Sequence, residues 1–367
     1  MTRSELLQSE LSKKILVLDG AMGTAIQSKN LTAKDFGGDA LEGCNENLIL
    51  TRPDVIQSIH EQYLEAGCDI IETNTFGATP LVLDEYGLGA KAYEINVQGA
   101  RIARKAAEKF STSSQPRFVA GSIGPTTKAI SVTGGITFDE LAENFYQQTL
   151  GLIDGGVDYL LLETCQDTRN IKAGLLGIDR AQAERKTQLP LAVSGTIEPM
   201  GTMLAGQSIE ALYTSLAHRD LLYLGLNCAT GPEFMTDHIR SASKLSKFKI
   251  ACVPNAGLPD ENGQYLETPE MMAQVISRFI SQGWINLVGG CCGTTHEHIK
   301  RFSELVKGKT PRTPQIETRS FLSGIEFLEV TDDLRPILVG ERTNVIGSKK
   351  FKELICENKF IDAAEVA

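Results

Sequence analysis

The chain has 367 residues with 42% hydrophobic content and a formal net charge of −10, so it can bury a full core and exceeds a typical single domain. No cluster of lysine and arginine interleaves with aromatic residues, and no apolar run reaches the roughly 18 residues of a membrane span, which argues against nucleic-acid binding and membrane insertion. The polar first eight residues lack the apolar segment of a signal peptide, so we expect a cytoplasmic protein whose thiols stay reduced.

Short β-branched or aliphatic runs alternate with longer segments of helical period, which is the pattern of parallel βα units. The runs expected to be strands are 15–19, 69–74, 118–122, 159–164, 191–196, 223–228, 250–254 and 286–290. The expected helices between them include 53–66, 90–109, 137–151 and 269–282. Eight such units in about 300 residues predict an α/β fold, a closed (β/α)8 TIM barrel. A doubly wound open sheet is the weaker alternative, because no GxGxxG turn follows the first run.

Polar residues stand at the carboxyl end of the expected strands, where barrel enzymes place their chemistry. In chain order they are Asp19, Glu72 with Asn74, Ser122, Glu163, Ser194 with Thr196, Asn227 with Cys228, Asn255, and Cys291 with Cys292. Because the carboxyl ends of parallel strands meet at one mouth of a barrel, we expect these residues to share one site.

Three of these residues, Cys228, Cys291 and Cys292, predict a thiolate site for zinc. The Cα atoms of adjacent cysteines lie about 3.8 Å apart, below the roughly 4.4 Å at which unstrained disulfides begin, so Cys291 and Cys292 do not pair with each other. Both sulfurs can meet one ion only where the strand breaks, and the glycines on both sides of the pair allow that break. Three protein ligands with an open fourth position describe a catalytic zinc site. The alternative is that all three are buried small hydrophobic residues, which is the favoured interpretation for the five cysteines that stand singly.

Asn255 follows the seventh run, which the cysteine-bearing sixth and eighth runs flank. Its carboxamide oxygen could fill the fourth zinc position, or the asparagine could simply shape a turn. The sequence leaves both interpretations open.

Asp19 and Glu163 come from opposite sides of the expected barrel and could bind an ammonium group or act as acid and base. Asp19 with Gly20 also fits an ordinary turn at a strand end. Backbone N–H groups of the loops 20–23 and 121–126, which contain Gly20 and Ser122, could hold a carboxylate. His296 and His298 follow a helix N-cap at 294–295, and we expect them to be solvated first-turn residues rather than metal ligands.

Five segments carry a resemblance to a known family. They are ILVLDGAMGT at 15–24, DIIETNTF at 69–76, GLNCA at 225–229, PNAGLP at 254–259 and GGCCGTT at 289–295. Together they resemble the zinc-dependent homocysteine S-methyltransferases, in the form of the homocysteine-binding module of the cobalamin-dependent methionine synthases, over roughly residues 10 to 308. The resemblance implies that Cys228, Cys291 and Cys292 hold zinc, that the thiol of L-homocysteine joins as a further ligand, and that Asp19 and Glu163 bind its ammonium group.

The segment 335–351, RPILVGERTNVIGSKKF, resembles the opening strand and loop of the methyltetrahydrofolate-binding barrel of the same synthases. We therefore expect residues 1–310 to form the homocysteine-binding barrel, 311–334 a linker, and 335–367 a truncated start of the folate-binding domain. Glu341 and Asn344 would belong to an incomplete folate site.

The resemblance also implies a methyl donor and partners. Methylcobalamin, held by a domain outside this chain, would methylate the homocysteine thiolate, and methyltetrahydrofolate would restore the methyl group. The partners are then homocysteine and the cobalamin- and folate-binding domains of the full-length enzyme. One alternative is a stand-alone homocysteine methyltransferase that uses betaine or S-methylmethionine, and another is a non-catalytic zinc or redox-sensing module.

Overall fold

The structure is a computed structural model that describes residues 2–314, 319–338, 340 and 343–366. The chain divides into two units, residues 1–318 with 322–328 and residues 319–321 with 329–367.

Eight parallel strands form the sheet of the larger unit, in the order β1-β8-β7-β6-β5-β4-β3-β2. They are β1 (Leu16–Val17), β2 (Ile70–Glu72), β3 (Phe118–Ile123), β4 (Tyr159–Cys165), β5 (Leu191–Gly195), β6 (Tyr223–Asn227), β7 (Lys249–Val253) and β8 (Leu287–Val288). A parallel bridge between Leu18 and Ile70 joins the first strand to the second. The predicted (β/α)8 barrel is confirmed, and each strand overlaps the run expected for it.

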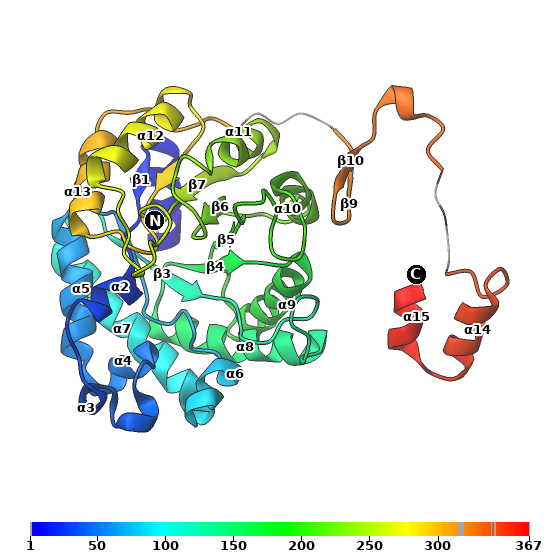
Figure 1. Ribbon diagram of the computed structural model, residues 1–367, viewed down its shortest axis with the longest axis horizontal. Coiled ribbons are helices and arrows are strands. Elements are labelled where there is room, and N and C mark those ends of the chain that lie inside the picture. Colours follow the sequence, from blue (N-terminus) through cyan, green and yellow to red (C-terminus); the bar gives the residue numbers. More distant parts are fainter. Residues whose placement is uncertain (1, 315–318, 339, 341–342, 367) are drawn as a thin grey trace. The chain divides into compact units, whose positions relative to one another are not determined.

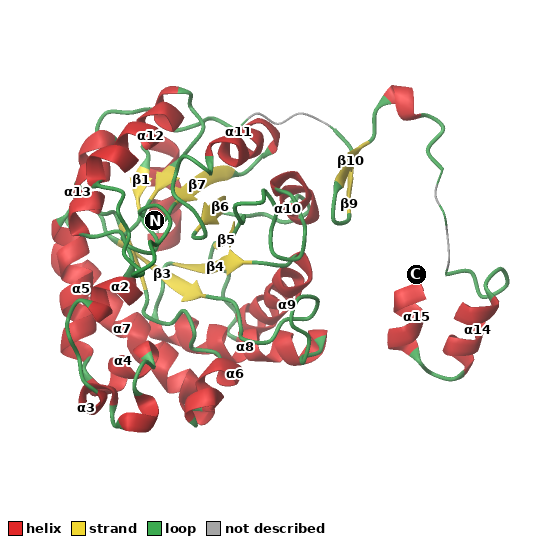
Figure 2. Ribbon diagram, viewed as in Figure 1, coloured by secondary structure: helices red, strands yellow, loops and turns green. Residues whose placement is uncertain are grey.

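Helices alternate with the strands and surround the barrel (Figures 1 and 2). Those of the larger unit are α1 (Arg3–Lys13), α2 (Met22–Gln27), α3 (Ala33–Phe36), α4 (Leu48–Thr51), α5 (Pro53–Glu65), α6 (Pro80–Leu83), α7 (Ala92–Phe110), α8 (Phe138–Gly155), α9 (Thr168–Glu184), α10 (Ile209–Leu216), α11 (Thr236–Leu245), α12 (Pro269–Ser281) and α13 (His296–Leu305). The four helices expected from the sequence correspond to α5, α7, α8 and α12. Within the described ranges, we find no helix whose length and apolar character would suit a bilayer crossing.

Local sequence sets where these helices begin. The Thr137 hydroxyl accepts from Glu140 N and the Glu140 carboxylate accepts from Thr137 N, a capping box that starts α8. Thr268 caps α12, and Pro269 occupies its first turn, where a missing N–H costs no hydrogen bond.

The strands separate two apolar layers, because successive side chains point to opposite faces. Side chains on the inner face fill the barrel, among them Leu16, Ile70, Phe118, Tyr159 and Tyr223. The intervening positions, among them Val17, Ile71, Val119, Leu160 and Leu224, pack with the helices. Within the barrel the hydroxyls of Tyr159 and Tyr223 lie 2.9 Å apart and satisfy each other by a hydrogen bond.

Helix α1 packs on the inner layer. Its Leu7 and Leu11 are fully buried and belong to the same cluster as the side chains that fill the barrel. Arg3 Nε donates to Asp158 Oδ1 at 2.8 Å, and Asp158 directly precedes β4. The helix therefore covers the amino-terminal end of the barrel, away from the strand ends at which the sequence predicts the site.

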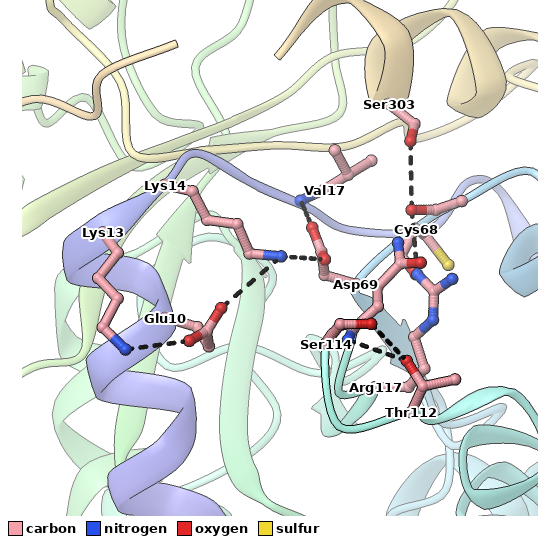
Figure 3. Close-up of polar contacts among 12 residues, drawn as sticks. Glu10, Lys13, Lys14, Val17, Cys68, Asp69, Thr112, Ser114, Arg117 and Ser303 are labelled. Carbon is pink, nitrogen blue, oxygen red and sulfur yellow. Dashed lines mark hydrogen bonds and ion pairs between the residues drawn. The ribbon is translucent and has the colours of Figure 1, made fainter. Parts of the chain in front are cut away.

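A polar layer fixes this end of the barrel (Figure 3). Lys14 Nζ lies 2.8 Å from Asp69 Oδ1, and Asp69 Oδ2 accepts from Val17 N at 2.9 Å. Arg117 Nη1 donates to the carbonyl of Gly67 at 3.1 Å. Each buried charge at this end has a partner of opposite sign or a backbone oxygen, which offsets the cost of removing it from water.

Beyond residue 318, β9 (Phe321–Ser323) and β10 (Phe327–Glu329) form a two-stranded sheet, and α14 (Lys349–Cys356) and α15 (Phe360–Val366) are helices. The expected opening strand after Arg335 lies partly outside the described residues, and its described part, 335–338, forms no strand. A parallel strand needs neighbouring strands to satisfy its N–H and C=O groups. Asn344 Oδ1 instead accepts from Ile346 N at 2.9 Å, as in a turn, whereas Glu341 lies outside the described residues.

Removing the apolar contact of α1 tests its role as a cover. We expect Leu11→Ala to lower the free energy of unfolding by about 2–5 kcal/mol, since it leaves a cavity in a packed core. Lys13→Ala, on the solvent side of the same helix, should change it by no more than about 0.5 kcal/mol. Urea denaturation followed by circular dichroism measures both. Equal effects of the two substitutions would show that α1 contributes no core packing.

Candidate active site

Three cysteine sulfurs meet at the carboxyl end of the barrel. Cys228 follows β6, and Cys291 and Cys292 follow β8. Their Sγ atoms all lie within 4.8 Å of one another, and those of Cys228 and Cys292 are 4.0 Å apart. Zinc–sulfur bonds of about 2.3 Å at tetrahedral angles would separate two sulfurs by about 3.8 Å, so the trio fits one zinc ion. The structure thus brings together the cysteines that the sequence singled out.

The backbone at both strand ends departs from strand geometry. Cys228 has a φ of 65° and Ala229 a φ of 56°, in the left-handed region that non-glycine residues seldom adopt. At Gly290 a Cβ atom would lie 2.3 Å from Thr294 Oγ1, and at Gly293 it would lie 2.1 Å from the Tyr265 ring. Only glycine fits these two positions, and the turn that they permit places both cysteines of the pair at the mouth.

The three thiols share hydrogen bonds. Hydrogen bonds with Cys228 and with Cys291 hold the pKa of the Cys292 thiol well below its usual range. These hydrogen bonds favour ionisation of one thiol of the trio, and a divalent ion would favour ionisation of all three. Of the cysteines that stand singly in the sequence, Cys44, Cys68, Cys165 and Cys252 are buried and Cys356 is exposed.

Asn255 lies between the two cysteine-bearing turns. Its backbone N donates to the carbonyl of Thr230 at 3.0 Å, and on the following residue Ala256 N donates to the carbonyl of Cys292 at 2.9 Å. The side chain is buried, and within the described part of the chain its Oδ1 has no hydrogen-bond partner. A buried amide oxygen without a partner is costly, which favours the interpretation of Asn255 as a ligand over that of a simple turn residue.

A cavity of about 260 Å³ opens beside the sulfurs. Its lining residues include four carboxylates, Asp19, Glu46, Glu72 and Glu163, together with all three cysteines. Lysine, arginine and histidine are not among the described residues that line it. The pocket is therefore negative, and it is smaller than the roughly 300–1,000 Å³ of sites for drug-sized ligands.

Glu163 points inward from β4. Ser122 Oγ donates to Glu163 Oε1 at 2.5 Å, so Ser122 orients this carboxylate. Burial raises the pKa of the Glu163 carboxyl to about 7, although the bond from Ser122 lowers it. Such a carboxylate becomes fully charged once a cation enters the pocket.

Asp19 and Glu72 stand on neighbouring strands. Glu72 N donates to Asp19 Oδ2 at 3.0 Å. Burial is the main cause that raises the pKa of both carboxyls, and the charge of Glu163 adds to it in each case. Gly20 lines the pocket, and a Cβ there would lie 2.8 Å from the ring of Tyr63, so the glycine is required for packing as well.

The structure corrects the expectation for one of the two histidines that follow the cysteine pair. His298 is not solvated: its ring is buried, Nδ1 accepts from Thr295 N at 3.1 Å, and Nε2 lies 2.9 Å from the carbonyl of Glu267. The apolar stripe of α13 turns this position inward, and the ring completes the cap of the helix. His296 is exposed and pairs with Glu297, as expected for a first-turn residue.

Glu72 lines the pocket, as expected for one of the strand-end residues that the sequence placed at a common site. Thr164 also lines it, although the sequence did not single it out. It could not have been found, because strand alternation would turn its side chain outward.

Comparison with known proteins agrees with this geometry. The family model for homocysteine S-methyltransferase matches residues 16–306. The metallated form of the homocysteine methyltransferase MmuM from Escherichia coli superposes with a TM-score of 0.65 at 22% identity, covering 83% of this chain and 99% of that one. The oxidised form of the same enzyme superposes with a TM-score of 0.64 at 23% identity, covering 79% of this chain and 95% of that one. These structures share the fold.

The sulfur geometry predicts that the chain binds roughly one zinc ion. Cys291→Ala or Cys292→Ala should abolish stoichiometric zinc, because two thiolates leave too few ligands for a stable tetrahedral site. Cys356→Ala removes an exposed thiol distant in sequence from the three cysteines and should leave the zinc content unchanged. Metal analysis after dialysis measures the content, and full zinc in both site variants would contradict the assignment.

Proposed function

Because the chain belongs to the homocysteine S-methyltransferase family, we propose that it is the homocysteine-activating module of a cobalamin-dependent methionine synthase. In this proposal the module prepares the homocysteine sulfur for methyl transfer from methylcobalamin and yields methionine. The intact enzyme would convert 5-methyltetrahydrofolate and homocysteine to tetrahydrofolate and methionine. The observation that carries the proposal is the convergence of three cysteine sulfurs on an acidic pocket.

Cys228, Cys291 and Cys292 would hold zinc. When bound, zinc would supply a Lewis acid that keeps the homocysteine sulfur deprotonated at neutral pH, and the thiolate is the nucleophilic form. Asn255 would occupy the fourth position in the absence of substrate, which would give its buried oxygen a partner. A reducing compartment such as the cytoplasm would keep the three thiols available as ligands. The metallated form of MmuM supports a metal in this fold.

The carboxylates would select the amino acid. Asp19 and Glu163 would bind the ammonium group of homocysteine, with Ser122 holding Glu163 in place. A cation is the group that such a pocket, with buried carboxylates and no positive side chain among its described lining residues, accepts most readily. Backbone N–H groups of the loop that begins at Gly20 would face the substrate carboxylate.

Two features favour a donor carried by another domain. Segment 335–351 resembles the start of the folate barrel, and we assign 1–310 to the homocysteine barrel, 311–334 to a linker and 335–367 to that folate-binding region, with Glu341 and Asn344 in its site. Large apolar side chains are also exposed on loops that follow the strands; they are Phe76, Met200, Leu204, Phe234, Leu258 and Leu266. Exposed apolar side chains around a site are typical of a surface that another domain covers.

A stand-alone methyltransferase with a small methyl donor is the second candidate. It is supported by the match to MmuM, 99% of whose chain is covered. A non-catalytic zinc or redox module would have no use for the oriented carboxylates of the pocket.

The ammonium contact predicts a selective effect of Glu163→Gln. We expect homocysteine affinity to fall about tenfold to a hundredfold, because a hydrogen bond to a charged group is lost. Affinity for 4-mercaptobutanoate, which has the same thiol and carboxylate but no amino group, should stay nearly unchanged. Calorimetry with both ligands measures the difference, and an equal loss for both would show that Glu163 does not bind the ammonium group.

The donor separates the two candidate functions. With free methylcobalamin the protein should form methionine slowly, because a donor in free solution lacks the effective concentration of a donor held on a linked domain. Betaine and S-methylmethionine should give no turnover. Methionine formation with each of the three donors is the assay. Robust turnover with either small donor and none with methylcobalamin would assign the chain to the stand-alone enzymes.

A further inference from the structure

Strand β4 contains an irregularity beside the pocket. Leu162 pairs with Val193 and Cys165 pairs with Gly195, so two residues, Glu163 and Thr164, lie opposite one residue of β5. This is the arrangement of a β-bulge, which redirects side chains next to functional sites. Thr164 has a φ of 53°, uncommon for a β-branched residue. As a result Thr164 faces the pocket beside Glu163 instead of the helices.

Left-handed backbone also follows an inward polar residue at the end of β6. Asn227 is the last residue of the strand, and the next residue, Cys228, has a φ of 65°. In both strands an inward polar residue, Glu163 or Asn227, is followed by a residue in the left-handed region. Conformations of this kind are unfavourable for residues other than glycine and persist only where surrounding contacts hold them.

The Asn227 side chain supplies contacts that connect the two strand ends. Its Oδ1 accepts from Thr164 N at 3.0 Å and from Ser194 Oγ at 2.6 Å. Its Nδ2 donates to Thr164 Oγ1 at 2.7 Å. Thr196 Oγ1 donates to the carbonyl of Asn227 at 3.0 Å. One buried amide therefore spans β4, β5 and β6, and it binds both the backbone and the hydroxyl of the bulge residue.

Asn227 and Glu163 also border a common void. A cavity of about 10 Å³ is lined by both residues together with Ser194 and Tyr223. The void is at most about the size of one water-sized probe, so the asparagine is held by close packing together with its hydrogen bonds to Thr164 and Ser194.

We propose that Asn227 is a positioning residue that couples the metal ligand Cys228 to the substrate carboxylate Glu163, through its paired hydrogen bonds with Thr164. The inference rests on the proposed function, since it takes Cys228 as a ligand and Glu163 as the ammonium site. Asn227 directly precedes Cys228, and its side chain binds Thr164, which directly follows Glu163. Loss of the Thr164 contact would release both left-handed residues together.

The test compares the loss of one hydrogen bond with the loss of the whole Asn227 side chain. Thr164→Val removes the hydroxyl that accepts from Asn227 Nδ2 and keeps the shape of the side chain. Thr164→Ser keeps the hydroxyl and is the matched control, and Asn227→Ala removes the whole connection. The zinc affinity of each full-length variant is measured by competition with a chromogenic chelator, without homocysteine. Preference for homocysteine over 4-mercaptobutanoate is measured by calorimetry.

We expect Asn227→Ala to weaken zinc binding about tenfold to a hundredfold, which is the usual effect of losing a partner that orients a ligand. Thr164→Val should weaken it about tenfold, although Thr164 is not a ligand, and Thr164→Ser should stay within about twofold of wild type. The double variant Asn227→Ala with Thr164→Val should bind zinc no more weakly than Asn227→Ala alone, because both substitutions break the same contact between Asn227 and Thr164. The preference for homocysteine should fall in the same variants.

Wild-type zinc affinity in Thr164→Val, with only the unfolding midpoint lowered, would overturn the inference and leave Asn227 a structural residue. A loss of zinc affinity with an unchanged preference for homocysteine would overturn the coupling. If Asn227→Ala does not fold, the Thr164→Val and Thr164→Ser pair decides. If the wild type binds zinc but not homocysteine, the proposed function fails, and the zinc affinities of that pair still decide whether Asn227 positions Cys228.

Discussion

Consecutive residues of a β-strand point to opposite faces, and this site needs consecutive residues on the same side. The conflict arises on three strands, at Glu163 with Thr164, at Asn227 with Cys228, and at Cys291 with Cys292. A bulge resolves it on β4, left-handed backbone resolves it after β6, and glycines resolve it after β8. The geometry of the sulfurs and carboxylates thus depends on where each ladder of backbone hydrogen bonds stops.

The charge of the pocket determines what can enter it. Asp19, Glu72 and Glu163 are held close together, and burial favours their neutral forms. Three like charges without a counter-ion are unfavourable in such a site, so a ligand that brings an ammonium group, or a metal that neutralises the thiolates, makes the charged forms favourable. Binding of substrate and ionisation of the site are for this reason linked events.

Much of the barrel could be predicted because its strands are short apolar runs between turn residues, and the cysteines were visible as a pair flanked by glycines. The convergence of Cys228 with that pair followed from parallel strands that share one mouth. What escaped prediction depends on contacts far apart in the sequence. The tie between Asn227 and Thr164 joins positions 63 residues apart, and the buried ring of His298 lies against the carbonyl of Glu267, 31 residues earlier. The described residues 335–338, for which the sequence pattern predicts a strand, form none, because pairing depends on neighbours that a local pattern does not specify.

Helix α1 has a consequence for how the barrel forms. Its first charged residue, Arg3, bonds to Asp158, which lies 155 residues along the chain. During synthesis the helix therefore emerges long before its partner, and its apolar face at Leu7 and Leu11 has no barrel interior to enter until most inner strands exist. Contacts of such large sequence separation are slow to form. The growing chain carries an exposed amphipathic segment through this interval, and such a segment is what chaperones recognise in unfinished proteins.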